Sequence, residues 1–145
     1  MNNLIVTCSS CGRKSKFPAS KQHLHPKCGH CKAPIEMSRQ AVPVELGDHD
    51  FHDFVQGAPL PVMVDFFSPT CGPCQTMTPV VKAMAQEHIN RYIIAKVDTS
   101  KNQQIASFFN IRGVPSFLFF KNGSLIEQVG GAVPKNVLEQ KLKSL

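Results

Sequence analysis

Ser68-Pro69-Thr70-Cys71-Gly72-Pro73-Cys74-Gln75 is the stretch from which the rest of the chain is interpreted, because it holds two cysteines separated by Gly-Pro. It follows the apolar run Val62–Phe67, which predicts a buried strand, and precedes a helical pattern from Thr76 to His88. A pair of cysteines at this spacing, between a strand and a helix, predicts a site of thiol–disulfide exchange.

The position of the cysteine pair at a helix start has a physical consequence. The free N–H groups and the positive end of the helix dipole stabilise an anion there, so the Cys71 thiol should ionise more readily than an ordinary thiol. We therefore expect Cys71 to be the nucleophile and Cys74, one turn deeper, to be the resolving thiol. Pro73 suits the first helical turn, where its missing N–H is not needed.

The composition fits one domain of about 100 residues with a small appendage. The chain has 145 residues, is 42% apolar and has a mean hydropathy of −0.11. No apolar run approaches the roughly 18 residues that span a bilayer, so we expect no membrane partner. The first eight residues lack the basic and apolar regions of a signal peptide, which favours a cytoplasmic location. In that compartment cysteine pairs are metal ligands or redox catalysts.

Charge and cysteines are both concentrated near the N-terminus. Residues 1–40 contain seven lysines and arginines and one glutamate, so they carry the whole formal charge of +6. Four of the six cysteines also precede residue 32. These asymmetries predict a small domain over residues 1–40 and a second domain over residues 41–145, joined by a short linker from Arg39 to Pro43.

The N-terminal cysteines form a C-x2-C-x16-C-x2-C pattern, made by Cys8, Cys11, Cys28 and Cys31. Two such knuckles supply the four thiolates of a tetrahedral structural Zn²⁺ site. Because so short a segment cannot bury much of a core, the metal should supply most of its folding free energy. Two alternatives remain open: two disulfides, or replacement of a thiolate by His23, His25 or His30.

The basic N-terminal segment could meet nucleic acid, as other zinc ribbons do. However, it contains Phe17 as its single aromatic residue and has no ordered basic stripe. We therefore interpret its charge as a solvated face and expect no nucleic-acid partner.

Residues 44–145 predict alternating strands and helices. The expected strands are 44–46, 62–67, 91–97, 116–120 and 125–129. The expected helices are 49–56, 76–88, one that carries Ile105, Phe108 and Phe109, and 134–145. Asp48 is the expected cap of the first of these helices.

Asp65 is the anomaly in the apolar strand. By alternation it shares a face with Met63 and Phe67, where a carboxylate should be hard to ionise. It is our candidate for the buried base that takes the proton of Cys74, directly or through water. The alternative is a structural carboxylate with satisfied hydrogen bonds.

The motifs together resemble the thioredoxin family over all of residues 44–145. The resemblance is carried by Val64-Asp65-Phe66, Cys71-Gly72-Pro73-Cys74, Lys96, Ile111-Arg112-Gly113-Val114-Pro115, Phe120-Lys121-Asn122-Gly123 and Gly131. With four cysteines ahead of it, the chain is most similar to the zinc-containing second thioredoxins of bacteria. The resemblance implies an α/β thioredoxin fold, with a central mixed sheet and helices on both faces, preceded by a small zinc-ribbon-like domain.

The resemblance also implies roles for particular residues. Lys96 would be a charge partner that modulates Asp65; the alternative is an ordinary surface lysine. Pro115 would follow a cis bond and face the sulfurs, and the Val114 backbone would pair with an extended substrate. Gly131 would leave room for that peptide, or be a plain bulge. Gly72 and Pro73 complete the expected substrate-binding set.

The implied activity is that of a protein-disulfide reductase, with a redox-active Cys71–Cys74 pair that needs no cofactor. Its partners would be disulfide-containing client proteins and an NADPH-dependent thioredoxin reductase, and we expect a monomer. The chain departs from the family in having no tryptophan, with Phe67 and Thr70 at the two usual positions. This should reduce apolar contact with substrates.

Two other functions remain possible at this point. One is a zinc-ribbon binding module that carries a regulatory thiol pair. The other is a redox-switched chaperone, in which oxidation of the four N-terminal cysteines expels zinc and exposes apolar surface.

Overall fold

The computed structural model describes residues 2–145. Its elements in chain order are β1 (Asn3–Thr7), β2 (Lys14–Pro18), the 3-10 helix η1 (Ala19–Leu24), β3 (Val44–Glu45), α1 (Phe51–Gly57), β4 (Val62–Phe67), α2 (Gly72–Glu87), β5 (Ile93–Asp98), α3 (Gln103–Phe108), β6 (Ser116–Lys121), β7 (Ser124–Gly130) and α4 (Lys135–Lys143). Among these described residues, no helix has the length and apolar composition needed to cross a lipid bilayer.

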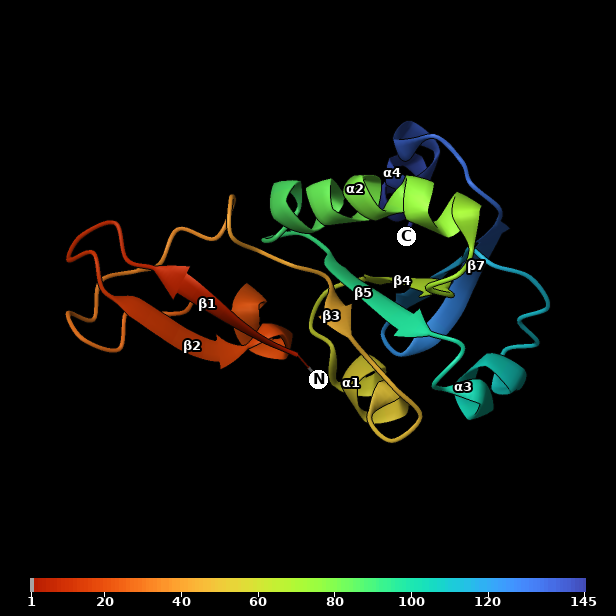
Figure 1. The fold of residues 1–145 in the computed structure, drawn as a ribbon, viewed down its shortest axis with the longest axis horizontal. Coiled ribbons are helices and arrows are strands. Elements are labelled where there is room, and N and C mark those ends of the chain that lie inside the picture. Colours follow the sequence, from red (N-terminus) through yellow and green to blue (C-terminus); the bar gives the residue numbers. More distant parts are fainter. Residues whose placement is uncertain (1) are drawn as a thin grey trace.

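A five-stranded mixed sheet forms the centre of the fold, in the order β3-β5-β4-β6-β7. β3, β5 and β4 are parallel, whereas β6 and β7 are antiparallel to their neighbours. In Figure 1, α2 and α4 lie above the sheet, and α1 and α3 lie below it. The predicted mixed sheet with helices on both faces is confirmed.

β4 is buried on both faces, which explains its nearly continuous apolar sequence. Val64 and Phe66 belong to the apolar cluster on the side of α1. Met63 packs on the opposite side with Met84 of α2 and other residues of α2 and α4. Since side chains alternate along a strand, Asp65 lies on the Met63 face, beneath α2, as the sequence predicts.

The N-terminal segment forms the antiparallel hairpin β1–β2, which projects to the left in Figure 1. Its apolar residues Leu4, Val6 and Ala19 are buried in the same cluster as Val44 and Ile93. The segment was expected to bury little apolar surface because it is short. The structure shows that it adds its apolar residues to the core of the chain that follows.

The link between the two parts is held by side chains. Gln22 is only 5% exposed, and its amide pairs with the backbone of Val42. The Val42 N–H donates to Gln22 Oε1 at 3.0 Å, and Gln22 Nε2 donates to the Val42 carbonyl oxygen. Asn2 acts similarly, since its Nδ2 donates to the Pro43 carbonyl at 3.3 Å and its Oδ1 accepts from the Glu45 N–H at 3.0 Å.

The prediction that Asp48 caps the following helix is wrong. Asp48 Oδ1 accepts the Ile105 N–H, in the first turn of α3, at 2.8 Å. The N-cap of α1 is Asp50, whose carboxylate accepts from the Gly47 N–H at 2.7 Å instead of bonding into the helix. Asp48 is held beside α3 because its own N–H donates to Asn102 Oδ1 at 3.0 Å. Asp48 therefore bonds to the start of α3 instead of capping α1.

Candidate active site

The cysteine pair lies where β4 ends and α2 begins. Cys71 is the N-cap residue of α2, and Cys74 lies in the first turn. The two form a disulfide, and the Cys74 N–H donates to Cys71 Sγ at 3.1 Å. Pro73 occupies the first turn, where a missing N–H leaves no carbonyl unpaired. The helix start thus directs an N–H group and its dipole at the sulfur of Cys71.

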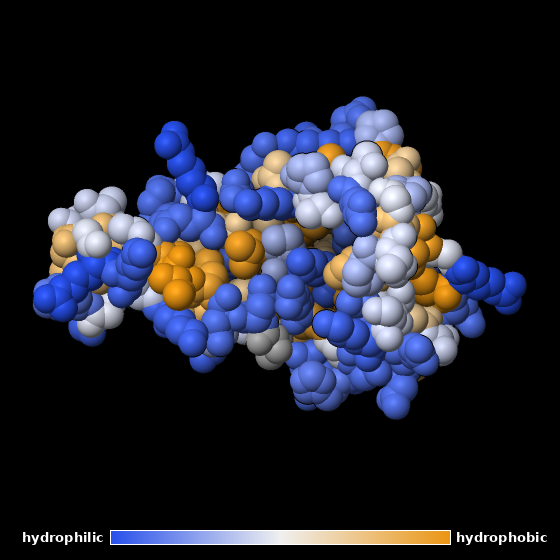
Figure 2. All heavy atoms as spheres, in the orientation of Figure 1, coloured by the Kyte–Doolittle hydropathy of each residue, from blue (hydrophilic) through white to orange (hydrophobic). Residues whose placement is uncertain are grey.

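The two cysteines differ in accessibility. Cys74 is 3% exposed, whereas Cys71 is only half-buried. An incoming disulfide can therefore reach the sulfur of Cys71 more easily than that of Cys74. In Figure 2 apolar atoms are visible at the right-hand end of the molecule, the end at which α2 begins, and also over the N-terminal part on the left.

The segment before β6 lies against the disulfide. The Val114–Pro115 bond is cis, as the resemblance implied, and the Val114 carbonyl oxygen lies 3.6 Å from Cys71 Sγ. The Gly131 N–H donates to the Pro115 carbonyl at 2.8 Å. Gly131 has a φ of 87°, in the left-handed region that favours glycine. The structure therefore brings Val114, Pro115 and Gly131 together beside Cys71.

Gly72, between the two cysteines, is exposed and lies at the same end of α2. Apart from its chain neighbours and the backbone of α2, none of the described residues has an atom within 4 Å of the place where a Cβ would be, so the surface is open here.

Asp65 lies in the sheet beneath α2 and is only 5% exposed. Its Oδ1 is buried and has no hydrogen-bond partner within residues 2–145. Burial raises the pKa of Asp65 to about 7, because the charged form loses its hydration, and the positive charge of Lys96 partly opposes this effect.

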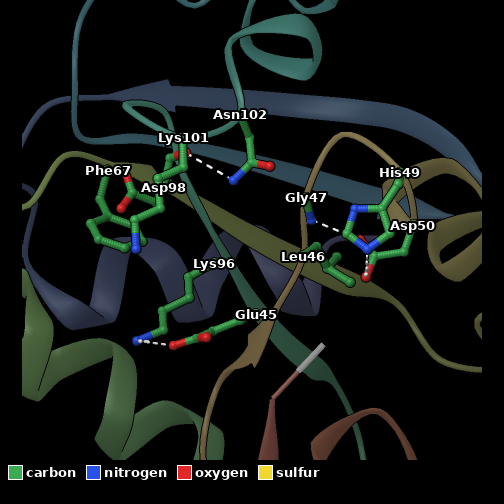
Figure 3. Close-up of a pocket in the computed structure, with 10 residues that line it drawn as sticks. All are labelled: Glu45, Leu46, Gly47, His49, Asp50, Phe67, Lys96, Asp98, Lys101 and Asn102. Atoms are coloured by element: carbon green, nitrogen blue, oxygen red, sulfur yellow. Dashed lines mark hydrogen bonds and ion pairs between the residues drawn. The ribbon is translucent and has the colours of Figure 1, made fainter.

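Lys96 lies directly across the parallel β4–β5 pair from Asp65. Its Nζ, however, forms an ion pair with Glu45 Oε1 at 3.4 Å and lies 5.6 Å from the centre of the Phe67 ring. Figure 3 shows the Lys96 and Glu45 side chains meeting end to end. Lys96 therefore acts on Asp65 through its field, and Glu45 is a charged neighbour that the sequence did not indicate.

The pocket in Figure 3 has a volume of about 280 Å³ and lies at the carboxyl ends of the parallel strands. Its polar groups hold the surrounding loops together. The Asp98 carboxylate accepts from the Ser100 N–H at 2.9 Å, and Asn102 Nδ2 donates to the Asp98 carbonyl at 3.1 Å. We interpret these contacts as structural.

The four N-terminal cysteines converge at the tip of the hairpin. Their sulfurs all lie within 4.8 Å of one another, with Cys8 Sγ 3.6 Å from Cys31 Sγ and Cys11 Sγ 3.6 Å from Cys28 Sγ. A tetrahedral Zn²⁺ with bonds of about 2.3 Å places its sulfurs about 3.8 Å apart, so the donor set fits this ion. None of the four is in a disulfide, and no histidine belongs to the group as the structure describes it.

A second cluster, Glu87, His88 and Glu139, joins the end of α2 to α4. His88 Nε2 lies 2.7 Å from Glu139 Oε2, and Arg91 Nη2 lies 3.0 Å from His88 Nδ1. Glu87 forms an ion pair with Lys135. The side chains of Lys135 and Arg91 therefore already contact groups that a metal ion would need as ligands. This is a structural network, and no sequence motif pointed to it.

Comparison with known proteins agrees with this geometry. A family profile described as "Thioredoxin" matches residues 42–144, and one described as "Thioredoxin 2, N-terminal", a zinc ribbon, matches residues 7–33.

Individual relatives cover the chain to different extents. "Thioredoxin C-3" from Corynebacterium nephridii is 33% identical over 141 residues, covering 94% of this chain and 92% of that protein. "Thioredoxin 1" from Nostoc sp. (strain PCC 7120) is 40% identical over 99 residues, covering 68% of this chain and 92% of its own. The solved structure of a mutant thioredoxin from Halobacterium salinarum NRC-1 superposes with a TM-score of 0.66 at 32% identity, covering 71% of this chain and 89% of that one. The chain therefore belongs to the thioredoxin family, as a thiol–disulfide oxidoreductase with an N-terminal zinc ribbon of the thioredoxin 2 type.

Proposed function

We propose that the chain reduces disulfides of client proteins in the cytoplasm, with Cys71 as the nucleophile and Cys74 as the resolving thiol. The observation that carries this assignment is the Cys74 N–H directed at Cys71 Sγ at the start of α2. An anionic sulfur gains from this hydrogen bond and from the helix dipole. The location is supported by the four N-terminal thiols, which must stay reduced to bind a metal.

The reaction proceeds in two exchanges. The Cys71 thiolate attacks one sulfur of the client disulfide, forming a mixed disulfide and releasing the other client sulfur as a thiolate that takes a proton from solvent. Cys74 then loses its proton and attacks Cys71 Sγ, which releases the second client sulfur as a thiolate. The two electrons come from the dithiol, which ends as the Cys71–Cys74 disulfide.

Asp65 is the proposed acceptor of the Cys74 proton. It lies beneath the helix that carries Cys74, and its pKa, raised by burial to about 7, suits a base that works near neutral pH. No group among the described residues donates to its buried Oδ1, so this oxygen is available to accept the proton. Lys96 adjusts this acidity through its charge.

The client is proposed to bind across Val114, Pro115, Gly131, Gly72 and Pro73. An extended peptide would pair with the Val114 backbone, as a strand is added to a sheet. Gly131 leaves space beside it. Since Phe67 and Thr70 stand where the family usually has tryptophan, we expect weaker apolar contact with clients.

The remaining assignments follow from family membership. An NADPH-dependent thioredoxin reductase would restore the dithiol, and the chain would act as a monomer. Residues 1–40 and 41–145 are the proposed domains, supported by the separate matches of the two family profiles.

Cys8, Cys11, Cys28 and Cys31 are proposed to hold one structural Zn²⁺. Four protein thiolates close the coordination shell, so the ion would stabilise the fold rather than take part in the exchange.

Serine substitutions should separate the two thiols. Cys71→Ser should reduce dithiol-driven insulin reduction at least about a hundredfold, because the accessible nucleophile is lost and the remaining thiol of Cys74 is buried. Cys74→Ser should also fail to turn over, but it should accumulate a mixed disulfide with insulin that is visible by mass spectrometry. Full activity in Cys71→Ser would refute the assignment. So would accumulation of the mixed disulfide with insulin in Cys71→Ser rather than in Cys74→Ser.

Asp65→Asn should remove a pH-dependent step. In the wild type, resolution of the mixed disulfide should accelerate as pH rises through about 7, where the Asp65 carboxyl loses its proton and can act as a base. Asp65→Asn should lack this transition and resolve about tenfold more slowly at pH 7.5. The measurement is quenched single-turnover kinetics with a disulfide-bonded peptide. Asp53→Asn, which alters an exposed carboxylate, is the matched control. An unchanged profile in Asp65→Asn would exclude the proposed base.

Zinc should be bound by thiolates alone. Metal analysis should find about one zinc per chain in the wild type, much less in Cys28→Ser, and an unchanged content in His30→Ala. Removal by a chelator should lower the melting temperature of the whole chain, because the hairpin shares its core with the sheet. An intact mass lower by four hydrogen atoms, in protein without zinc, would show two disulfides instead.

A further inference from the structure

A pocket of about 360 Å³ lies where the N-terminal segment meets the sheet and α2. We call it the junction pocket; its lining is Asn2, Asn3, Val42, Pro43, Glu45, Asp65, Phe67, Thr78, Val81, Lys82 and Lys96. Its volume is large enough for several water molecules, and its lining is both polar and apolar.

Asp65 is the most deeply buried polar group of this lining. Its Oδ1 has no hydrogen-bond partner among residues 2–145, and a buried polar atom in that position is usually paired with protein or water. Val81, which also lines the pocket, is buried, whereas Thr78 and Lys82 of α2 are exposed. The pocket therefore runs from solvent to the unpaired carboxyl group.

The N-terminal segment supplies the outer wall. The two hydrogen bonds of Asn2 to Pro43 and Glu45 hold the start of β1 against the start of β3. Asn3 is exposed, on the same face of β1 as Ile5. The Nostoc relative matches only 99 residues of this chain at 92% of its own length, so it has no room for an equivalent of this segment.

Among the described residues that line the junction pocket, neither Cys71 nor Cys74 is present. A client bound over Cys71 covers the surface beside Val114, which is not part of the lining either. Asp65 consequently has a connection to solvent that does not pass through the surface proposed to bind the client.

We propose that the junction pocket is the water-filled route by which the proton taken up by Asp65 leaves the protein, and that the N-terminal segment controls how well this route is hydrated. The inference rests on the proposed role of Asp65 as proton acceptor. It adds that the N-terminal segment, through Asn2 and Asn3, sets the pH at which Asp65 loses its proton. Water in the pocket would donate to the unpaired oxygen and would carry the proton outward while the client is still attached to Cys71.

The charged groups around this route come from three elements. Glu45 of β3 and Lys96 of β5, which form an ion pair, line the pocket together with Lys82 of α2. Cys74 of α2 does not titrate in the oxidised protein, because it is in the disulfide. Changes of pocket size that leave these four residues intact therefore report on the hydration of Asp65.

The test changes the pocket at an uncharged residue. In full-length, zinc-loaded, oxidised protein, the titration of Asp65 is followed by carboxyl ¹³C NMR. Asn3→Phe, which narrows the mouth, should raise the titration midpoint by roughly half a pH unit, and Asn3→Ala, which widens it, should lower it, because hydration favours the carboxylate. Ile5→Phe and Ile5→Ala alter the same strand face outside the pocket and should leave the midpoint unchanged.

A second pair of variants approaches the pocket from α2, and so does not depend on the N-terminal fold. Thr78→Leu fills the pocket and should raise the midpoint, whereas Thr76→Leu should not. The two threonines are matched, because both are exposed and both donate to the carbonyl four residues earlier, at 3.2 Å for Thr78 and 3.3 Å for Thr76.

Two results would overturn the proposal: unchanged midpoints in both the Asn3 and the Thr78 variants, or equal shifts in the Ile5 and Thr76 controls. Single-turnover kinetics distinguish failure of the proposed water route from failure of the proposed role of Asp65 as proton acceptor. If Asp65→Asn leaves the pH profile of resolution intact, Asp65 is not the proton acceptor, even where the NMR midpoint follows the pocket. If Asp65→Asn removes the pH dependence and the pocket variants do nothing, only the proposed route is lost.

Discussion

The hydrogen bond from the Cys74 N–H to Cys71 Sγ, at 3.1 Å, is the contact on which the chemistry depends. It exists because α2 begins at Gly72, after the short loop 68–71 that follows a strand buried on both faces. A central strand with helices above and below cannot shift its end without disturbing two apolar clusters. The position of the sulfur is therefore set by the packing of the whole sheet, and its tendency to ionise follows from that position.

The same strand creates the second requirement of the reaction, an acid whose proton is held near neutral pH. Asp65 is two residues beyond Met63 on a face that is otherwise apolar, so its ionisation is opposed by desolvation and only partly assisted by Lys96. Such a group destabilises the folded protein when it is charged. Its presence is explained if it accepts a proton during resolution, and the junction pocket offers the surroundings in which that proton can leave.

Local patterns predicted most of the fold and of the site. The continuous apolar run Val62–Phe67, the C-x-x-C spacings and the carboxylate of Asp65 within that run each involve neighbours in sequence, so they could be interpreted without coordinates. The capping of α3 by Asp48 and the pairing of Lys96 with Glu45 depend on loops and strands more than 50 residues apart, which no periodicity reveals. The shared core and the junction pocket were missed for the same reason, because they arise from how the hairpin lies against the sheet.

The most direct measurement is the ultraviolet absorbance of the thiolate as a function of pH in the reduced, zinc-loaded protein, taken as the difference between the wild type and Cys71→Ser so that the metal-bound sulfurs cancel. The account predicts a midpoint for Cys71 at least about one pH unit below the value of roughly 8.5 for a free cysteine. A difference curve with its midpoint at or above that value would contradict it, because the start of α2 would then contribute nothing to the ionisation of the sulfur.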